Sequence, residues 1–218
     1  MQRGVKQELP ELLPGRGAQT SRGLRRSELI LKVAAKLFAD NGFDRVSIND
    51  IGLAAGITGP AIYRYFASKE ALLVSAYESL YQRSSAGMKA ILAEDVGALE
   101  SLEKLVDLQL ELALEIPETI RIVDSEERHL PVKEADRFRA ENRRQLRIWT
   151  ELLRQARPDL TPTKCDMTVH GVLALINSIT RRRGEKSSPE GVRQHLRAMA
   201  MNAIAADVVN ERGNVRSA

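Results

Sequence analysis

The stretch that begins at Ser47, SINDIGLAAGITGPAIYRYFASK, constrains the fold of this 218-residue chain more than any other. Ser47 with Asp50 three residues later predicts the first turn of a helix, because the two can form a capping box. Gly56 predicts the end of that helix, since glycine adopts a positive φ at little cost. Thr58 as a cap and Pro60 in the first turn predict a second helix. The stretch therefore forms two short helices and a tight turn.

The second helix is expected over about residues 58–65, which is too short to be stable without packed neighbours. A short helix held by a scaffold is how helix-turn-helix proteins enter the major groove of DNA. Arg64 would then pair with guanine or grip a phosphate, while Gly59 and Ala61 would leave room for base edges. We therefore interpret this helix as a DNA-reading element.

Nine residues of the stretch are predicted to contact DNA. Three of them, Tyr63, Tyr65 and Lys69, would bind phosphates and so set the register. Tyr63 is the one for which a place in the core is the strongest alternative, whereas Ile62 and Phe66 are expected to point inward. The nine are Ser47, Thr58, Gly59, Pro60, Ala61, Tyr63, Arg64, Tyr65 and Lys69. The alternative for the whole stretch is a helical hairpin buried in an ordinary core. Such a hairpin would not need these residues around one short helix.

These residues resemble the DNA-binding segment of the TetR/AcrR family of bacterial repressors. The resemblance covers about residues 24–84 and rests on ILKVAAKLFADNGFDRVSINDIGLAAGI, on the aromatic cluster Tyr63, Tyr65 and Phe66, and on SKEALL. Tyr65 is a departure, because the family often has His there. The resemblance implies an all-α protein of about nine helices. Its three-helix DNA-binding domain would carry the helix-turn-helix at about 47–66, and a helical bundle for ligand binding and dimerisation would follow over 85–218.

Residues 1–23 contain several Pro and Gly residues and no sustained apolar period, which predicts a flexible basic arm. Arg22 and Arg25 are expected to contact DNA, as arms do in related DNA-binding folds. Residues 1–84 hold 12 Lys and Arg against 8 Asp and Glu, so their net charge equals the +4 of the whole chain. The attraction to phosphate is therefore expected to come from this third of the chain.

Several classes of protein are disfavoured by what the sequence lacks. No apolar run reaches the roughly 18 residues of a membrane span, and no apolar signal core is present, so we expect a cytoplasmic protein without a membrane partner. The single cysteine, Cys165, excludes an internal disulfide framework. Helical spacing brings no two of the three histidines together, and no catalytic or phosphate-binding motif is present. We expect no enzyme, no metal and no cofactor.

The remainder of the chain predicts a body of longer helices without strands or repeats. A helix beginning after Ser68 would link the DNA-reading domain to this body. Pro117, Pro131 and Pro158 separate the later helices. The expected ranges are 24–41, 99–115, 118–128, 132–157, 162–180 and 188–209.

The last two helices carry apolar stripes with many small residues, which allow close helix approach. We expect them to pair with their copies in a second subunit, because two recognition helices must read half-sites roughly 34–36 Å apart. The alternative is that both helices only complete the core of their own subunit. The predicted interface residues are Val172, Ile176, Ile179, Leu196, Met199, Ala200, Ala203 and Ile204.

The segment EERHLP, at 126–131, and the Arg-rich helix after it resemble the C-terminal domain of a TetR subgroup. Some relatives of that kind respond to acyl-CoA thioesters or other lipid metabolites. The candidate ligand-binding residues are Arg128, His129, Trp149 and Asn177, and a structural role is the preferred interpretation of each.

Taken with the resemblance, the sequence predicts a sequence-specific DNA-binding repressor, released from a palindromic operator by a small molecule bound in the C-terminal domain. The partners expected are double-stranded DNA, a second copy of the chain and a small-molecule effector. One alternative is an effector-independent nucleic-acid-binding protein of low sequence specificity. Another is a metabolite-binding protein or enzyme whose DNA-reading domain is vestigial.

Overall fold

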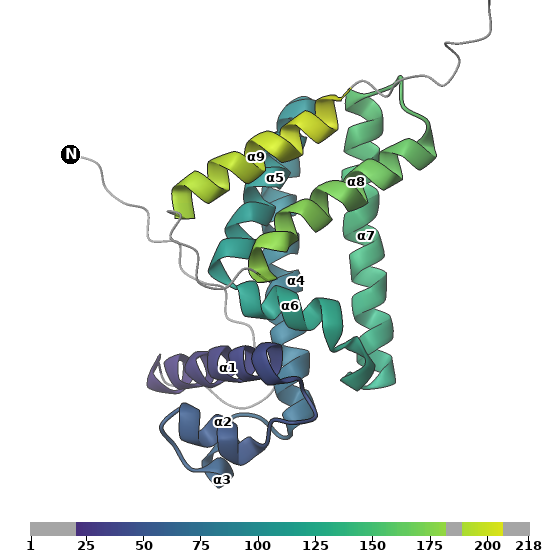
Figure 1. Ribbon diagram of the computed structural model, residues 1–218. Helices are drawn as coiled ribbons and strands as arrows, with labels where there is room; N and C mark the ends of the chain where they lie inside the picture. Colours follow the sequence, from purple (N-terminus) through teal and green to yellow (C-terminus); the bar gives the residue numbers. More distant parts are fainter. Residues whose placement is uncertain (1–20, 182–188, 207–218) are drawn as a thin grey trace, which may run out of the picture.

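The computed structural model describes residues 21–181 and 189–206. Within these residues the chain forms nine α-helices and two 3₁₀ turns and contains no strand, so the all-α prediction is confirmed (Figure 1). The elements are α1 (Ser21–Asn41), α2 (Ile48–Ala54), α3 (Gly59–Ile62), α4 (Lys69–Ala93), α5 (Ala98–Glu115), α6 (Pro117–Ser125), η1 (Glu127–His129), α7 (Val132–Ala156), α8 (Pro162–Asn177), η2 (Ser178–Arg181) and α9 (Pro189–Ala205).

Helices α1 to α3 and the first part of α4 form one end of the molecule, which we call the head (Figure 1). The head core contains Ile30, Phe38, Ile51 and Ile62, each at most 1% exposed. It also contains residues from beyond the head, among them Ile122 of α6 and Phe138 of α7, as well as Leu130 and Ala135. The head therefore completes its core with side chains from the rest of the chain.

Helix α4 runs without a break from the head into the remaining helices, which we call the body. Leu72 and Leu73 near its start lie in the head core, and Met88 and Ile91 near its end lie in the body core. The domain boundary expected between residues 84 and 85 falls inside this helix. Helix α4 therefore connects the two cores directly.

Several helices differ from their expected ranges. Helix α1 begins at Ser21, so Arg22 lies in its first turn and not in the predicted arm, while residues 1–20 of that arm lie outside the described residues. Helix α3 ends at Ile62, three residues early, and turns follow it. The helix expected over 118–128 ends at Ser125 and is followed by the separate turn η1.

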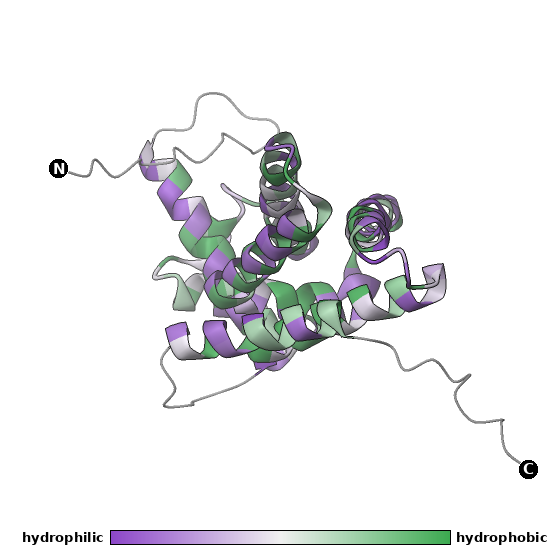
Figure 2. Ribbon diagram, turned by 90° about the horizontal axis from the view of Figure 1, so that it is seen from above, coloured by the Kyte–Doolittle hydropathy of each residue, from purple (hydrophilic) through white to green (hydrophobic). Residues whose placement is uncertain are grey.

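The body packs α8 and α9 against α5 and α7 through an apolar core. Figure 2, seen from above, shows hydrophobic and hydrophilic residues on different sides of individual helices. None of the helices in the described ranges is both long and apolar enough to cross a membrane.

The packing of α8 and α9 shows that part of the predicted dimer interface is wrong. Val172, Ile176, Leu196, Ala200 and Ile204 are each at most 9% exposed and belong to the subunit's own core. An apolar stripe does not reveal whether it faces its own subunit or a partner, and here the alternative interpretation was right for these five residues.

Candidate nucleic-acid interface and body cavity

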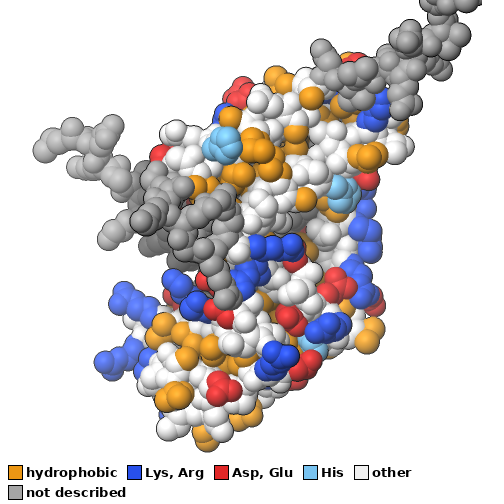
Figure 3. Space-filling view, in the orientation of Figure 1, with side chains coloured by type: hydrophobic (Ala, Val, Ile, Leu, Met, Phe, Trp, Pro, Cys, Tyr) orange, Lys and Arg blue, Asp and Glu red, His pale blue; other side chains and the backbone are white. Residues whose placement is uncertain are grey.

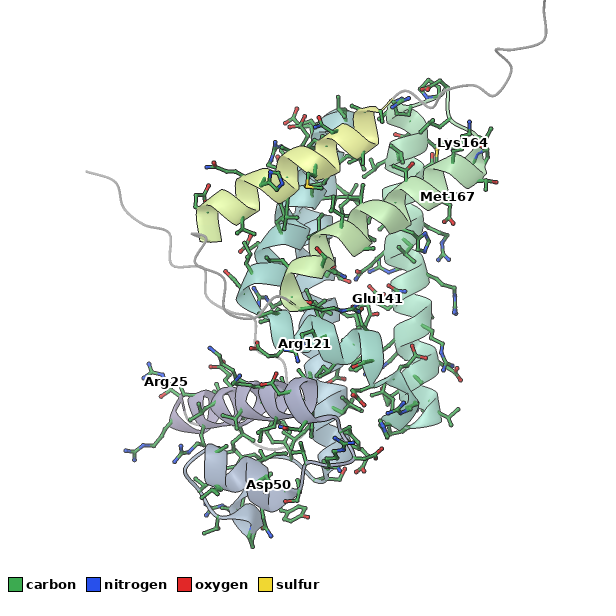
Figure 4. All side chains as sticks on the ribbon, viewed as in Figure 1. Arg25, Asp50, Arg121, Glu141, Lys164 and Met167 are labelled. Carbon is green, nitrogen blue, oxygen red and sulfur yellow. The ribbon has the colours of Figure 1, made fainter. Side chains whose placement is uncertain are left out.

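The predicted capping box at the start of α2 is present. Asp50 Oδ2 accepts hydrogen bonds from the backbone N of Ser47 (2.8 Å) and from its hydroxyl (2.7 Å), and Ser47 Oγ accepts from Asp50 N (3.1 Å). The side-chain bond with Ser47, followed by the backbone bond, lowers the pKa of Asp50. Figure 4 labels Asp50 on the outer side of the head. Ser47 is exposed, but its hydroxyl proton is engaged, so its contact with DNA stays a prediction.

Three glycines shape the segment from α2 to α3. Gly56 has φ +69°, the left-handed value expected for a helix stop. A Cβ atom on Gly52 would lie 2.8 Å from Gly59 N, and one on Gly59 would lie 1.9 Å from Asn49 Oδ1. Gly59 is also buried. It therefore lets α3 pack against α2, which corrects the interpretation that it leaves room for a base edge.

Helix α3 is held as predicted from its inner face. Ile62 (0% exposed) and Phe66 (5%) are buried in the head core. Thr58 is the N-cap residue, but its side chain makes no capping hydrogen bond, so the predicted cap is wrong in that respect. The helix is instead stabilised by packing of its inner side.

The outer side of the same segment carries most of the residues that were predicted to contact DNA. Tyr63 is 54% exposed, so the alternative that placed it in the core was wrong. Thr58, Pro60 and Arg64 are exposed as well, whereas Ala61 and Tyr65 are half-buried. Because α3 is anchored by its buried inner face, the turn directly after it can present the exposed Arg64 side chain to a groove.

Lys69 has internal partners that the sequence did not indicate. Its ammonium donates to the carbonyl oxygens of Phe43 (3.0 Å) and Val46 (3.1 Å) and lies 4.2 Å from the centroid of the Phe43 ring. This arrangement ties the start of α4 to the loop before α2. The interpretation of Lys69 mainly as a phosphate contact is therefore corrected: it positions the head.

Arg22 and Arg25 are exposed on α1. Figure 4 labels Arg25 at the outer end of this helix, and Figure 3 shows blue basic side chains projecting there. Neighbouring Arg26 differs, because its Nη1 donates to the carbonyl oxygen of Ala55 at 3.4 Å. Contact of Arg22 and Arg25 with DNA stays a prediction.

The contacts between head and body converge on α6. Arg121 donates to the carbonyl oxygen of Ala39 and to Asp40 Oδ1 (3.0 Å), both at the end of α1. Tyr77 Oη of α4 lies 3.1 Å from the carbonyl oxygens of both Ile122 and Val123. Burial, and then the charge of Glu127, raises the pKa of Tyr77, so the phenol stays a donor. Helix α6 is therefore joined by polar bonds to two helices of the head.

The hydroxyl of Tyr77 allows a test of this contact region between head and body, which we call the joint. We expect Tyr77→Phe to lower the free energy of unfolding by about 0.5–1.5 kcal/mol, because the hydrogen bond of the phenol to the two carbonyl oxygens is lost while Ile122 O keeps the bond from Glu126 N. Denaturant titration would measure the change. Tyr81→Phe, one turn later on α4, is the matched control, since its hydroxyl has no hydrogen bond to another described residue. Equal effects of the two substitutions would contradict the role assigned to Tyr77.

Arg128 and His129 also lie at the joint and not in a cavity, which corrects their prediction as ligand-binding residues. The His129 ring stacks on Phe43 of the head, with 4.7 Å between centroids. Its Nε2 lies 3.5 Å from carboxylate oxygens of Asp44 and Glu126. Arg128 is exposed, and its Nε donates to His129 Nε2 at 3.0 Å. Their position agrees with the structural role that was the preferred interpretation of each.

The body contains a cavity of about 110 Å³ between α4, α5, α6, α7 and α8. Trp149 and Asn177, the other two predicted ligand-binding residues, line it. Asn177 Oδ1 accepts a hydrogen bond from Gln109 Nε2 at 2.7 Å. The full lining comprises Leu80, Tyr81, Ser84, Gln109, Ile120, Val123, Asp124, Asn142, Gln145, Leu146, Trp149, Leu173 and Asn177. The sequence did not indicate the other eleven, because they come from five helices far apart in the chain.

Two family models match the chain. The model described as bacterial regulatory proteins, tetR family, matches residues 30–76. The model described as tetracyclin repressor-like, C-terminal domain, matches residues 95–204. The first match spans most of the head and the second nearly all of the body.

Curated relatives match part of the chain. The HTH-type transcriptional regulator EthR of Mycolicibacterium smegmatis is 37% identical over 73 residues, which are 34% of this chain and 34% of that protein. The HTH-type transcriptional repressor KstR2 of Rhodococcus jostii is 29% identical over 130 residues, 59% of this chain and 63% of that protein. The chain thus matches less than two thirds of the length of either relative.

Solved structures match over more of the chain. The ketosteroid transcriptional regulator KstR2 of Mycobacterium tuberculosis superposes with a TM-score of 0.72 at 25% identity, covering 82% of this chain and 93% of that one. AibR, solved with isovaleryl coenzyme A and operator DNA, superposes with a TM-score of 0.67 at 18% identity, covering 81% and 98%. The second similarity is one of fold.

Proposed function

The chain belongs to the TetR family of bacterial regulatory proteins and is a DNA-binding transcriptional regulator, and we propose that it is a homodimeric repressor that leaves a palindromic operator when a small molecule enters the body cavity. The observation that carries the proposal is the position of α3. Ile62 of α3 and Phe66 just after it are buried, while Tyr63 and Arg64 in the turn that follows α3 are exposed. Side chains anchored in this way can be inserted into a major groove.

Dimerisation is proposed through the exposed face of the last two helices. Met167 (68% exposed) and Ala174 of α8 lie on this face with Met199 (41%) and Ala203 of α9. Figure 3 shows orange apolar side chains on this side of the molecule, between two pale blue histidines. Exposed methionines beside small residues favour close packing against a second copy. We call Met167, Ala174, Met199 and Ala203 the α8–α9 face. Two of them, Met199 and Ala203, were predicted from the sequence as interface residues.

The proposed release rests on the position of α6 between cavity and head. Ile120, Val123 and Asp124 of α6 line the cavity. Arg121, labelled in Figure 4 above α1, and Ile122 contact the head. A ligand that displaces the cavity side of α6 would therefore move α1 and change the spacing of the two heads. Such a ligand shifts the dimer from DNA only to the extent that it binds the released arrangement more tightly.

Selection of genomic fragments by purified protein at fixed, near-physiological salt would test the proposed function. We expect one enriched inverted-repeat motif. Arg64→Ala should weaken binding to it by about 1–3 kcal/mol for each half-site, roughly 5- to 150-fold per head, because one arginine paired with guanine supplies that much discrimination. Fluorescence anisotropy with a labelled duplex would measure the affinity.

Lys36→Ala is the matched control for that experiment. Lys36 is an exposed basic residue of α1 that is paired with Asp40 at 3.0 Å, and it is not among the predicted DNA contacts. Its loss should change affinity far less than the loss of Arg64. Uniform, weak binding to all fragments would favour the alternative, an effector-independent protein of low sequence specificity.

A further inference from the structure

Among the described residues that line the body cavity, Asp124 is the one that carries a charge. Its side chain is 35% exposed, and burial raises the pKa of this carboxyl, while the charge of Arg181 opposes the shift. Arg181 Nη2 lies 3.5 Å away, but that side chain is 72% exposed and is not part of the lining. No described residue donates a hydrogen bond to the carboxylate. Arg181 therefore balances the negative charge of Asp124 only in part, and this charge would attract a cation inside the cavity.

Glu141, near the same region, provides a contrast (Figure 4). Its two carboxylate oxygens accept from Arg144 at 2.9 Å and 2.7 Å, and Oε1 also accepts from Ser85 and Gln145. These bonds, with that from Arg144 the strongest, lower the pKa of Glu141 to about 2. The negative charge of Glu141 is thus balanced by hydrogen bonds from described side chains, whereas Asp124 has only the ion pair with Arg181.

The neutral groups of the lining suit a cationic nitrogen. The rings of Tyr81 and Trp149 both line the cavity, and aromatic faces attract ammonium groups. Because Gln109 donates to Asn177 through Nε2, Oε1 of Gln109 is not used in that bond and can accept a hydrogen bond. The hydroxyl of Tyr81 can accept a further N–H. An ammonium group, which offers only donors, matches this set.

The size and the apolar side of the cavity limit the ligand further. Leu80, Ile120, Leu146 and Leu173 form an apolar part of the wall. The volume of about 110 Å³ is below that of an engineered cavity of about 150 Å³ that holds benzene. A ligand of this size can carry only a short apolar chain. A coenzyme A thioester is much larger, and its phosphate groups would find no Lys, Arg or His among the described lining residues.

We propose that the cavity binds a small organic ammonium ion, with its nitrogen at Asp124 and its short apolar chain against the leucines. Release from DNA by such a ligand rests on the proposed function, whereas binding of the ligand does not. The binding itself can be measured without DNA, because Trp149, the single tryptophan of the chain, lies in the lining and is 5% exposed.

The test is a titration of Trp149 fluorescence in the full-length protein with n-butylammonium chloride, 1-butanol and sodium butyrate at matched ionic strength. These probes have nearly the same shape and differ in charge. We expect saturable binding of the ammonium ion, at least about tenfold tighter than that of the alcohol or the carboxylate. Asp124→Asn, which keeps the shape of the side chain, should remove this preference. Asp136→Asn, an exposed aspartate paired with Arg139 outside the cavity, is the matched control.

Arg181→Ala separates cation binding from anion binding. If the ligand is a cation, loss of this competing guanidinium should tighten binding of n-butylammonium. Tighter binding of butyrate or isovaleryl coenzyme A than of the amine would overturn the proposal. So would unchanged amine binding in Asp124→Asn, or no saturable response to any probe.

The same preparations should be assayed for operator binding by anisotropy. Specific DNA binding without saturable amine binding would leave the proposed repressor standing and remove the ligand class. Saturable amine binding without specific DNA binding would remove the proposed function and keep the cavity as an amine site.

Discussion

Gly52→Ala is expected to destabilise the head and to weaken operator binding by at least about tenfold. The added Cβ atom would lie 2.8 Å from Gly59 N and 3.0 Å from both Gly59 Cα and Ile57 O. All three are backbone atoms, so the clash cannot be relieved by a side-chain rotation. Overpacking of this kind costs about 1–3 kcal/mol. Because Gly59 begins α3, the displacement moves the recognition helix directly.

Denaturant titration and DNA anisotropy would measure the two effects of Gly52→Ala. Gly97→Ala is the control, since a Cβ atom at Gly97 would have no neighbour within 4 Å. That substitution should leave operator affinity unchanged. Full affinity in Gly52→Ala would show that α2 and α3 can separate without harm to the DNA-reading surface, contrary to the packing described above.

Ala203→Glu is expected to dissociate the proposed dimer and, with it, to abolish high-affinity operator binding. A carboxylate on the α8–α9 face would be buried without a partner in each subunit, and the two copies would repel if they meet near the symmetry axis. A single head contacts only one half-site, so affinity should fall by several orders of magnitude. Sedimentation velocity would report the mass, and anisotropy the affinity.

The control for that experiment is Ala198→Glu. Ala198 is also exposed on α9, but five residues rotate its side chain by about 140° from that of Ala203. The protein should stay dimeric with this change. A dimer that withstands Ala203→Glu, or one that is lost only with Ala198→Glu, would mean that the subunits meet through a different surface.

The sequence predicted the helix-turn-helix well because its signals are local. The Ser47–Asp50 capping box and the positive φ of Gly56 depend on neighbouring residues, and both are present. The same local signals could not identify the partners of Gly59 and Lys69. Those partners are Asn49 and the carbonyl groups of the loop before α2, and they become neighbours only when the head folds.

The body was harder to predict, since helical periodicity identifies an apolar face without identifying what covers it. Val172 and Ala200 were assigned to a partner subunit but pack inside their own. His129 was assigned to a ligand site because of its chemistry, but it stacks on Phe43. Trp149 and Asn177 do line the cavity. Asp124 carried no signal, because an aspartate near a helix end is usually solvated.

The shared core of the head has a consequence for protein engineering. Ile122, Leu130, Ala135 and Phe138 fill the head from α6, α7 and the segment between them. A chimera that joins this DNA-reading segment to the ligand-sensing part of a relative, cut between residues 84 and 85, would divide α4 and replace that apolar plug with foreign side chains. The unit that can be exchanged between relatives therefore consists of two separate stretches of the chain. A functional biosensor built from this chain would have to transplant those four residues together with the head.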